Sequence, residues 1–408
     1  MSCRNCNNTL VHKFVDLGFS PPSNSYLKHV DLSGSETYYP LRVYVCEKCW
    51  LVQTEDYATA EEIFNDEYAY FSSTSQSWLK HASDYVDMII PRIKLNNKSL
   101  VIEIASNDGY LLRNFIDKDI PCLGIEPTFC TAEKARALDI PVEQVFFSEE
   151  VAIKLANNAK ADLIIGNNVF AHVPDLISFT RGIEILLKDE GTVTLEFPHL
   201  HNLIRLGQFD TIYHEHFSYY TLKSAMNVFK NQGLRIYDVE EVPTHGGSLR
   251  IYGCKAGSKI PSNDTSLNKV LNDENSAGLN KLDAYLVFQN QVDKIKDELL
   301  QFLIKAKMDG KKVAGYGAAA KGNTLLNYAG VKPDLIPYIC DLAESKQGKY
   351  TPGGHIPIYD VEKLYQDKPD YILILPWNIS EEVIRQNKNA RDWGAKFVVA
   401  IPEIKIIS

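Results

Sequence analysis

The sequence has no long apolar run and no excess of positive charge. Its 408 residues carry 43 Lys and Arg against 52 Asp and Glu, which gives a net charge of -9 and a pI near 5.6. This balance disfavours electrostatically driven binding to nucleic acids or membrane surfaces. No apolar run could span a bilayer, and the first residues lack the apolar core of a signal peptide. We therefore expect a cytoplasmic protein that acts on small molecules, without nucleic acid or membrane as a partner.

The chain is too long for one ordinary hydrophobic core. With 408 residues and 45% hydrophobic residues, it is predicted to form two or three domains. Neither coiled-coil heptads nor a large apolar repeat marks an interface between copies. We therefore expect a monomer or a weak homo-oligomer.

Four of the eight cysteines form two CxxC pairs, Cys3 with Cys6 and Cys46 with Cys49. Four thiolates complete the closed tetrahedral shell of a structural Zn2+ ion. A small module with little core of its own gains much of its folding free energy from such a metal. We therefore predict a zinc-binding module over residues 1–74. A redox dithiol is the alternative, which the presence of two pairs disfavours.

Apolar strands alternate with helical stretches between residues 75 and 255. A helix predicted over Ser77 to Ile93 precedes the strand Ser99 to Ile104, which leads into the turn Ala105 to Gly109. Further strands are predicted at Pro121 to Glu126, Ala161 to Gly166 and Gly191 to Phe197. Strands spaced by helices of this length indicate right-handed βαβ crossovers and a doubly wound parallel sheet.

Residues 256–408 are predicted to form a second α/β domain. Residues 256 to 278 are rich in Ser, Asn, Asp and Gly and are expected to form a linker or a surface excursion. A long amphipathic helix from about Leu279 to Met308 follows, and a new βαβ series begins at Lys311 to Gly322. The fold class is therefore α/β, with a small zinc module, a central Rossmann-like domain and a C-terminal Rossmann-like domain.

The loop after the first predicted strand lacks the G-x-G-x-x-G pattern that favours a dinucleotide pyrophosphate. Its sequence, Ala105-Ser-Asn-Asp-Gly109, better suits a cofactor without phosphates. Glu126 ends the second strand, where a carboxylate accepts hydrogen bonds from ribose hydroxyls. That acid alone fits NAD or S-adenosylmethionine, and the loop favours S-adenosylmethionine. The predicted cofactor-binding residues are Glu103, Ser106, Asn107, Gly109, Glu126 and Asn167.

Six residues with acid–base or hydrogen-bonding side chains lie close together after the strand that ends at Phe197. They are Tyr213, His214, Glu215, His216, Tyr219 and Tyr220. An imidazole, with an ordinary pKa of about 6.5, suits proton removal near neutral pH. A phenol can donate a hydrogen bond to a developing oxyanion, and a carboxylate can orient an imidazole. An aromatic wall with surface histidines and a metal site are the alternatives.

Three further segments carry polar residues toward the same region. His172 follows the strand Ala161 to Gly166 and should point into the same cleft. The turn from Gly315 to Gly322 opens a helix, so that free amides and Lys321 could meet a diphosphate, with helix–strand packing as the alternative. The segment His245-Gly-Gly-Ser-Leu-Arg250 offers Ser248 and Arg250 to an anionic substrate, or serves as a glycine turn.

Seven motifs follow one another along the chain. They are the paired CxxC, Glu67 to Ser73, Glu103 to Gly109, Asn167 to Pro174, Tyr213 to His216, His245 to Arg250 and Gly315 to Asn323. In this order, and over nearly the whole chain, they resemble the S-adenosylmethionine-dependent sugar C-methyltransferases that act on nucleotide-linked 4-keto-6-deoxysugars, the C-3'-methyltransferase type. Ala105 departs from the family's usual glycine.

The resemblance implies a zinc-binding substrate lobe, a central class I methyltransferase domain and a nucleotide sugar bound between the central and C-terminal domains. It implies His216 as the base that removes a proton next to the ketone, with Tyr213 and Glu215 as neighbours. Tyr70 and His172 would line the sugar. Tyr213 or His172 would hold the ketone oxygen while the enolate carbon takes the methyl group. The expected substrate-binding residues are His214, His245, Ser248, Arg250, Lys321 and Asn323.

Other functions remain open from the sequence. A nicotinamide-dependent oxidoreductase would use the Gly315 loop, with Asp341 as the acid that binds ribose. An O-methyltransferase would need a base beside a hydroxyl group rather than a site for an enolate. A zinc-dependent binding module with a degenerate methyltransferase fold would have lost the acid–base cluster, which is intact.

Overall fold

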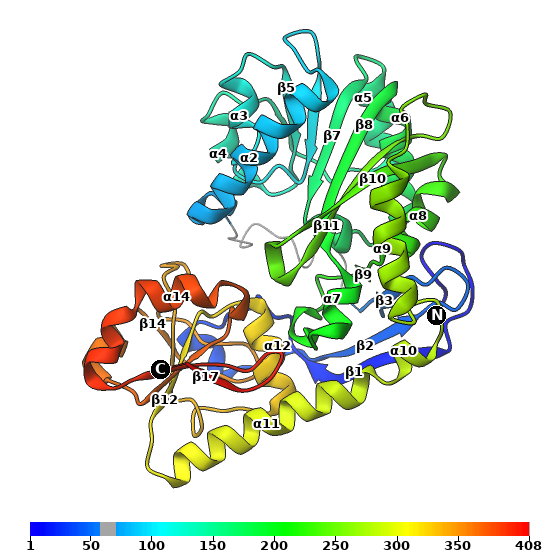
Figure 1. Cartoon of the computed structure of the whole chain (residues 1–408). Coiled ribbons are helices and arrows are strands. Elements are labelled where there is room, and N and C mark those ends of the chain that lie inside the picture. Colours follow the sequence, from blue (N-terminus) through cyan, green and yellow to red (C-terminus); the bar gives the residue numbers. More distant parts are fainter. Residues whose placement is uncertain (58–70, 408) are drawn as a thin grey trace.

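Within the residues that the structure describes, 1–57 and 71–407, three β-sheets organise the chain (Figure 1). The structure is a computed structural model. The first sheet is antiparallel and contains β1 (His12–Ser20), β2 (Tyr39–Val45), β3 (Val52–Thr54) and β9 (Ser218–Tyr219), in that order. Because β9 contains Tyr219 of the predicted acid–base cluster, this pairing ties the cluster to the N-terminal module.

The second sheet has seven strands and forms the central domain. In spatial order they are β10 (Leu234–Val242), β11 (Ser248–Lys255), β8 (Leu187–Pro198), β7 (Ala161–Asn167), β4 (Val101–Ile104), β5 (Cys122–Ile125) and β6 (Val142–Glu143). The strands from β8 to β6 are parallel, and β10 and β11 form an antiparallel hairpin. Strand order reverses between β4 and β7, which is where such sheets bind ligands.

Helices cover both faces of this sheet because its strands are apolar on both sides. They are α2 (Gln76–Ile93), α3 (Arg113–Ile116), α4 (Phe129–Arg136), α5 (Glu149–Ala156), α6 (Leu176–Leu186) and α8 (Leu222–Asn231). Helix α7 (Leu200–Arg205) packs instead in the core of the N-terminal module and the C-terminal domain. In β4, Val101 packs with α2 and α3, whereas the next residue, Ile102, packs with α5, α6 and α8. This alternation follows from the two-residue period of a strand. The predicted strands and the helix from Ser77 to Ile93 are confirmed.

The third sheet forms the C-terminal domain. Its spatial order is β14 (Ile358–Tyr359), β13 (Ile339–Cys340), β12 (Val313–Tyr316), β15 (Tyr371–Ile374), β16 (Lys396–Val399) and β17 (Lys405–Ile407). All neighbours are parallel except β17. The associated helices are α12 (Ala320–Ala329), α13 (Glu362–Asp367) and α14 (Ser380–Gln386). Strand order reverses at β12 and β15, so this sheet has a switch point of its own.

The expectation of a linker over residues 256 to 278 is wrong for its second half. Helix α9 (Asp264–Ser276) begins there, with the Asn263 side chain accepting a hydrogen bond from the Ser266 backbone as an N-cap. Its Leu267 and Val270 are buried, three residues apart on one face. The polar composition concealed a helix because Ser, Asn and Asp also form caps and exposed helix faces.

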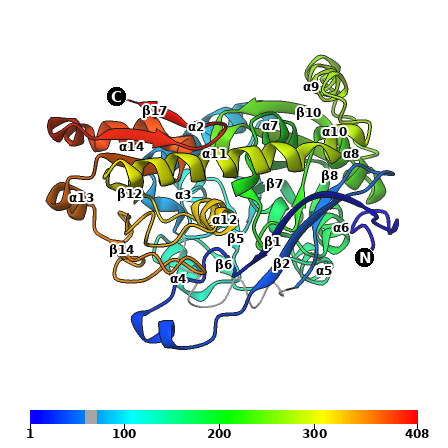
Figure 2. The same ribbon diagram turned by 90° about the horizontal axis from the view of Figure 1, so that it is seen from below.

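The expected long helix over 279 to 308 is divided into α10 (Asp283–Leu286) and α11 (Phe288–Met308). Helix α11 crosses beneath both the N-terminal strands and the C-terminal domain (Figure 2). Phe14 of β1 stacks on Phe288 with ring centroids 4.6 Å apart. The expected boundaries at residues 74 and 255 separate the three sheets apart from β9, but the N-terminal module and the C-terminal domain share one hydrophobic core.

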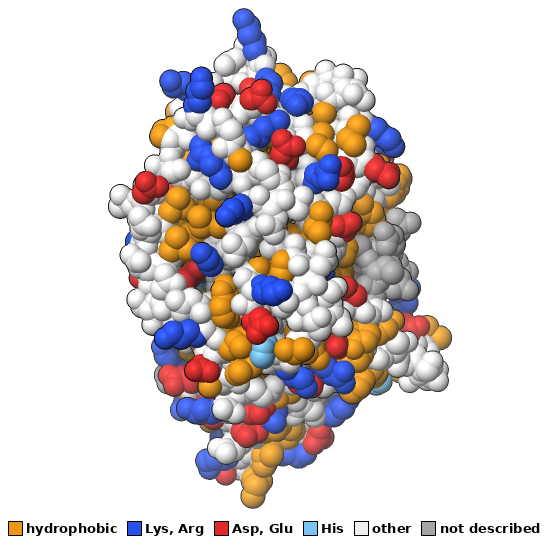
Figure 3. All heavy atoms as spheres, turned by 90° about the vertical axis from the view of Figure 1, so that its right-hand side faces the viewer, with side chains coloured by type: hydrophobic (Ala, Val, Ile, Leu, Met, Phe, Trp, Pro, Cys, Tyr) orange, Lys and Arg blue, Asp and Glu red, His pale blue; other side chains and the backbone are white. Residues whose placement is uncertain are grey.

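Over the described residues, 1–57 and 71–407, the structure contains no helix with the length and apolar character that a membrane crossing requires. The face drawn in Figure 3 carries acidic and basic side chains side by side.

Candidate active site

The four N-terminal cysteines converge on one point. Their sulfur atoms all lie within 4.8 Å of one another, with 3.4 Å between Cys3 and Cys49 and 3.5 Å between Cys6 and Cys46. A tetrahedral zinc ion with Zn–S bonds of about 2.3 Å needs sulfur atoms about 3.8 Å apart. Four thiolates at this spacing fit Zn2+ with a closed shell, so the predicted zinc is structural.

The two cysteine pairs occupy matching backbone turns. After each pair the backbone is left-handed, at Asn7 with a φ of 57° and at Trp50 with a φ of 61°. Asn7 N donates to the Cys3 carbonyl oxygen at 2.9 Å, and Trp50 N donates to that of Cys46 at 2.8 Å. The same backbone geometry therefore fixes the position of the sulfur atoms in both pairs.

Replacing Cys49 with serine is expected to cost the chain most of its bound zinc and to loosen the N-terminal module, because the metal supplies folding free energy there. Elemental analysis of the purified protein gives the zinc content, and limited proteolysis reports the order of the module. Cys130→Ser is the control, since Cys130 is an exposed single cysteine. An undiminished zinc content in the Cys49 variant would contradict the assignment.

The loop after β4 lies at the switch point of the central sheet. Its backbone is left-handed at Ala105, Asn107 and Gly109, with φ angles of 57°, 50° and 78°. A Cβ at Gly109 would lie 2.4 Å from Ile140 Cδ1. Only glycine combines this close approach with a positive φ at no cost. Gly109 therefore shapes the cofactor loop by packing against its neighbours.

Buried polar atoms without a hydrogen-bond partner surround this loop. They are Glu103 Oε2, Ser106 Oγ, Asp108 Oδ1 and both amide atoms of Asn167. Burial, followed by the Glu126 and Asp108 carboxylates, raises the pKa of Glu103 well above its usual value. Unpartnered buried polar atoms cost free energy that a polar ligand recovers. The set fits S-adenosylmethionine, which offers an ammonium, a carboxylate, hydroxyls and a positively charged sulfur.

Glu126, directly after β5, holds the loop in place. Its Oε2 accepts a hydrogen bond from Asn107 N at 2.9 Å, and its Oε1 accepts from Thr128 N and Thr131 Oγ1, both at 3.0 Å. A carboxylate has about four lone-pair sites. Glu126 therefore keeps capacity for a ribose hydroxyl while it orders the loop.

The residues at the end of the Glu67 to Ser73 motif contact this loop. Ser72 N donates to Asn107 Oδ1 at 2.9 Å, and Ser73 Oγ donates to Asp108 Oδ2 at 2.6 Å. Tyr70, predicted to line the sugar, lies outside the described residues.

His216 is held in one tautomer. Its Nδ1 donates to the Thr211 carbonyl oxygen at 2.7 Å, so the lone pair is on Nε2. Burial, together with the His172 ring, lowers the pKa of His216 well below its usual value. The imidazole is therefore neutral near pH 7 and ready to accept a proton.

Tyr213 and His172 flank His216, as the sequence predicted. The ring centroids of Tyr213 and His216 are 4.0 Å apart, and those of His172 and His216 are 4.6 Å apart. His172 ends the 3-10 helix η3 (Phe170–His172), which directly follows β7. Burial lowers the pKa of His172 to about 4, so this ring is neutral as well. The three side chains form a compact acid–base cluster beside the switch point.

His245 extends this cluster. Its Nε2 accepts a hydrogen bond from Asn168 Nδ2 at 3.0 Å, and its ring lies 5.3 Å from that of Trp78 in an edge-to-face contact. Burial, followed by the Lys321 charge, lowers the pKa of His245 to about 4. Trp78 was not predicted, because an aromatic residue on an amphipathic helix usually belongs to the core.

Glu215 and His214 contact the N-terminal module. Glu215 Oε1 accepts a hydrogen bond from Asn24 Nδ2 at 2.7 Å, and His214 Nε2 donates to the Pro40 carbonyl oxygen at 3.2 Å. Asn323, on α12, likewise donates to the Ser23 carbonyl oxygen at 2.7 Å. His214 and Asn323 were both expected to bind the substrate. In the structure these hydrogen bonds join their side chains to the N-terminal module.

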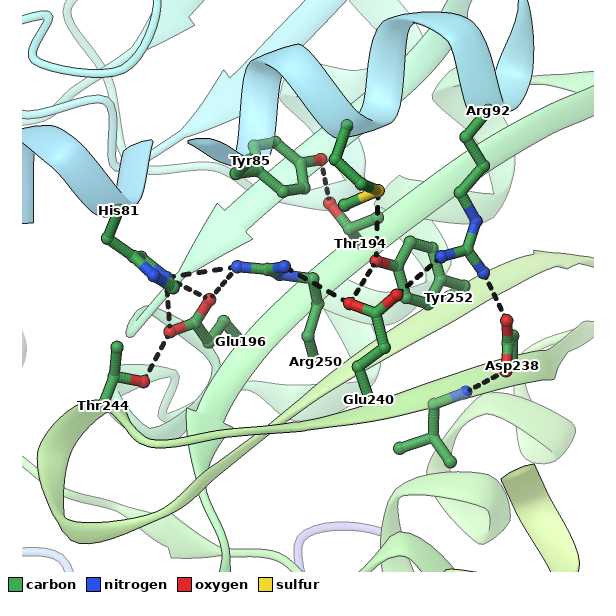
Figure 4. A network of polar contacts seen from close by, with 12 residues as sticks. His81, Tyr85, Arg92, Thr194, Glu196, Asp238, Glu240, Thr244, Arg250 and Tyr252 are labelled. Atoms are coloured by element: carbon green, nitrogen blue, oxygen red, sulfur yellow. Dashed lines mark hydrogen bonds and ion pairs between the residues drawn. The ribbon is translucent and has the colours of Figure 1, made fainter. Parts of the chain in front are cut away.

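Arg250 pairs with protein carboxylates instead of standing free for a substrate (Figure 4). One guanidinium nitrogen lies 2.9 Å from Glu196 Oε2, and another lies 3.4 Å from Glu240 Oε2. The Glu196 side chain has no exposed surface. Ser248 Oγ is also engaged, since it donates to the Thr244 carbonyl oxygen at 3.0 Å.

Glu196 connects this network to the catalytic cluster. Its Oε1 accepts a hydrogen bond from Thr244 Oγ1 at 2.7 Å, and its Oε2 accepts from His81 Nε2 at 2.9 Å (Figure 4). Thr244 precedes His245, so the buried carboxylate fixes the start of that turn. The sequence signal was available, since Glu196 is the acid within the apolar stretch Gly191 to Phe197.

The Gly-rich turn after β12 packs internally. A Cβ at Gly317 would lie 2.5 Å from Pro376 Cδ, and one at Gly322 would lie 2.8 Å from Leu375 Cβ. Ala318 N, expected to be free for a phosphate, donates to Asp341 Oδ2 at 2.7 Å. The glycines therefore serve helix–strand packing, the alternative noted from the sequence.

Asp341 is fully engaged within the C-terminal domain. Besides Ala318 N, it accepts hydrogen bonds from Ala343 N at 2.8 Å and from Lys346 Nζ at 3.3 Å. A carboxylate with these partners is a poor receptor for a nicotinamide ribose. This geometry weighs against the oxidoreductase reading of the chain.

A doubly wound sheet whose switch-point loop lacks a phosphate-binding pattern, next to buried neutral histidines, is typical of an S-adenosylmethionine-dependent methyltransferase. Family models agree with this class. Residues 3–64 match a zinc binding domain, residues 78–239 match a methyltransferase domain and residues 243–402 match a C-methyltransferase C-terminal domain.

The chain is 33% identical over 407 residues to the C-methyltransferase NovU of Streptomyces niveus, covering 100% of this chain and 96% of that protein. The chain therefore belongs to this C-methyltransferase family, which confirms the family resemblance of the seven motifs. It is an enzyme that transfers a methyl group from S-adenosylmethionine to carbon, and its zinc is structural.

Solved structures resemble the chain over less than half its length. An S-adenosylmethionine-dependent methyltransferase from Clostridium acetobutylicum is 13% identical, covers 44% of this chain and 92% of its own, and has a TM-score of 0.35. Magnesium protoporphyrin IX methyltransferase of Synechocystis with bound S-adenosylmethionine is 12% identical, covers 48% and 88%, and has a TM-score of 0.34.

Proposed function

We propose that the enzyme methylates a carbon next to the ketone of a nucleotide-linked 4-keto-6-deoxysugar, at C-3', through an enolate that His216 generates. The observation that carries this proposal is the state of His216, whose Nδ1–H is fixed on Thr211 while the neutral Nε2 is left as the proton acceptor. A carbon next to a ketone becomes nucleophilic only after such a deprotonation, so its methylation needs a base of this kind.

The chemistry proceeds in two steps. His216 Nε2 takes the proton from the carbon next to the ketone, and the electron pair of that C–H bond moves into the enolate. The enolate carbon then bonds to the methyl group, while the bond between methyl and sulfur breaks and the neutral thioether leaves. S-adenosylmethionine supplies this activated methyl group when bound. The proton on His216 returns to solvent.

Tyr213 and His172 support the first step by their positions. Both rings lie within 5 Å of the His216 ring, measured between centroids, at 4.0 Å and 4.6 Å. Their polar hydrogens can meet the ketone oxygen as negative charge develops there. Glu215, fixed by Asn24, is proposed to order the loop that carries the base.

Deuterium exchange tests the proposal. The enzyme is incubated in D2O with S-adenosylhomocysteine and 4-keto-6-deoxyhexoses linked to thymidine, uridine, cytidine or guanosine diphosphate, and NMR follows the hydrogens at C-3' and C-5'. We expect enzyme-dependent exchange at C-3' with one of these sugars, and a new C-methyl group at that carbon when S-adenosylmethionine is present.

The same experiment separates the alternatives. Exchange at C-5' would overturn the choice of carbon, because a C-4' ketone acidifies hydrogens on both sides. A methyl signal on oxygen without exchange would establish O-methylation. Absence of exchange and of methylation with all four nucleotides would overturn the proposed substrate class.

A further inference from the structure

Lys321 lies at the switch point of the C-terminal sheet, where strand order reverses between β12 and β15. It is in the first turn of α12, which follows β12, and its Nζ donates to Asn378 Oδ1 at 2.8 Å. The ammonium also sits over the Trp377 ring, 4.9 Å from its centroid. Asn378 and Trp377 belong to the 3-10 helix η6 (Trp377–Ile379), which follows β15. The segments that follow β12 and β15, on the two sides of the switch point, therefore meet at this cation.

The turn before α12 offers little to the diphosphate cradle that the sequence led us to expect, because three of its amides are engaged. A cradle needs free backbone amides in addition to the lysine. Ala318 N is bound to Asp341, Ala319 N donates to the Gly317 carbonyl oxygen at 2.8 Å, and Gly317 N donates to that of Cys340 at 2.7 Å. Lys321 is left as a single, largely shielded charge.

Trp377, the ring beneath this charge, connects it to the segments that carry the histidines. Trp377 Nε1 donates to Asp210 Oδ2 at 2.7 Å, and Asp210 directly precedes Thr211, whose carbonyl holds His216. A Cβ at Gly246 would lie 2.4 Å from the Trp377 ring, so that ring also rests on the turn of His245. Trp377, which the lysine contacts, therefore touches the segment that leads to His216 and the turn that carries His245.

Asp210 is a buried carboxylate that can accept further hydrogen bonds. Its side chain is fully buried, and its Oδ1 has no hydrogen-bond partner. Burial raises the pKa of Asp210 to about 6, although the Lys321 charge and the Trp377 hydrogen bond lower it. In turn, burial lowers the pKa of Lys321 and the Asp210 charge raises it. Above about pH 6 the carboxylate therefore helps to keep the ammonium charged.

The two histidines near the base bring no positive charge of their own to the enolate. His172 and His245 both have pKa values lowered to about 4, so near pH 7 they are neutral. The enolate carries a full negative charge on oxygen, and a cation in a shielded site stabilises it more strongly than a neutral donor. Burial is the main cause of the lowered pKa of His216 and of His245, and the Lys321 charge lowers the pKa of both further.

We propose that the Lys321 ammonium donates a hydrogen bond to the ketone oxygen of the substrate and stabilises the enolate, and that Asp210 and Trp377 position this ammonium. The inference rests on the proposed enolate chemistry and adds to it a catalytic cation from the C-terminal domain. Both domains are then required for the chemical step, the central one for the base and the C-terminal one for the charge.

Deuterium exchange with Lys321→Gln tests the role of the cation. With the sugar nucleotide that the wild-type enzyme exchanges, we expect the saturating exchange rate to fall by about 100-fold, the usual effect of losing one oxyanion partner. The concentration for half-maximal exchange should change little. Lys321→Arg, which keeps the charge, should retain much more activity. Calorimetric titration with S-adenosylhomocysteine verifies that the central domain is intact.

The opposite pattern would overturn the inference. If Lys321 anchored the diphosphate, Lys321→Gln would raise the half-maximal concentration and leave the saturating rate unchanged. If the wild-type enzyme exchanges deuterium and Lys321→Gln does so at the same saturating rate, Lys321 has no part in the chemical step. The enolate mechanism would then still hold. No exchange by the wild type would instead defeat the proposed function itself.

Asp210→Asn tests whether Asp210 acts on the charge of Lys321 or only supports the fold. The amide can still accept the Trp377 hydrogen bond, but the charge that raises the pKa of Lys321 is gone. The ammonium contacts Asn378 and the Trp377 ring, and the charge that raises its pKa is the Asp210 carboxylate. We therefore expect the basic limb of the pH–rate profile to move to lower pH. A basic limb at the wild-type position would refute the role of Asp210.

Discussion

Replacing His216 with asparagine is expected to slow methyl transfer by about a thousandfold, within the range that general bases contribute. The asparagine can still donate a hydrogen bond to the Thr211 carbonyl oxygen, but it cannot accept the substrate proton. Initial rates with S-adenosylmethionine and the sugar nucleotide identified by exchange measure the effect. Binding of S-adenosylhomocysteine should survive, because His216 lies outside the loop from Ala105 to Gly109.

His29→Asn is the matched control for this variant. His29 is exposed on the 3-10 helix η1 (His29–Ser33), with Tyr350 as its hydrogen-bond partner. Its replacement should leave the rate within about twofold of the wild type, as surface substitutions usually do. A His216→Asn enzyme of normal activity would require another base in the cluster.

Replacing Arg250 with methionine is expected to lower the free energy of unfolding by about 3–5 kcal/mol, because it leaves the Glu196 carboxylate buried without its cation. Chemical denaturation followed by circular dichroism measures the change. Lys80→Met is the control, since it breaks an exposed pair with Asp84 and should cost at most about 1 kcal/mol. The double variant Glu196→Gln, Arg250→Met should recover part of the loss.

The same network makes the free energy of unfolding depend on pH in the acid range. Burial raises the pKa of Glu196, but His81 and Arg250 outweigh it and lower the pKa to about 2. A carboxylate with a lowered pKa stabilises the fold above the pKa of the unfolded chain, about 4.5, and this stabilisation is lost as pH falls toward 2. Arg250→Met should therefore flatten the acid limb of the stability profile. An unchanged acid limb would show that Arg250 does not control Glu196.

Some residues could be assigned from the sequence because their neighbours along the chain define them. The CxxC turns close by hydrogen bonds between residues four apart, so Cys3 and Cys46 needed no knowledge of the fold. The apolar run that became β4 and the loop after it likewise predicted a switch-point site. Helix α9 was missed because cap-forming residues dominate it, and its burial depends on partners elsewhere.

Arg250 shows what the sequence could not provide. In the sheet it lies opposite Glu196 of β8 on one side and opposite Glu240 of β10 on the other. Those partners are 54 and 10 residues away in the chain. From the sequence alone, an arginine after a glycine turn looked free to bind an anion. Strand order and register decided that it neutralises buried carboxylates instead.

The sequence by itself determined the family, the zinc ligands, the strand and helix pattern and the histidine cluster, because each depends on residue types at short spacings. Only the tertiary structure decided which polar groups remain available for chemistry. It engaged His214, Asn323 and Asp341 in contacts within the protein. It also connected Lys321, through Trp377 and Asp210, to the segment of another domain that carries His216. The physical reason is that a buried polar group must find a partner, and packing, not sequence order, determines which partners are within reach.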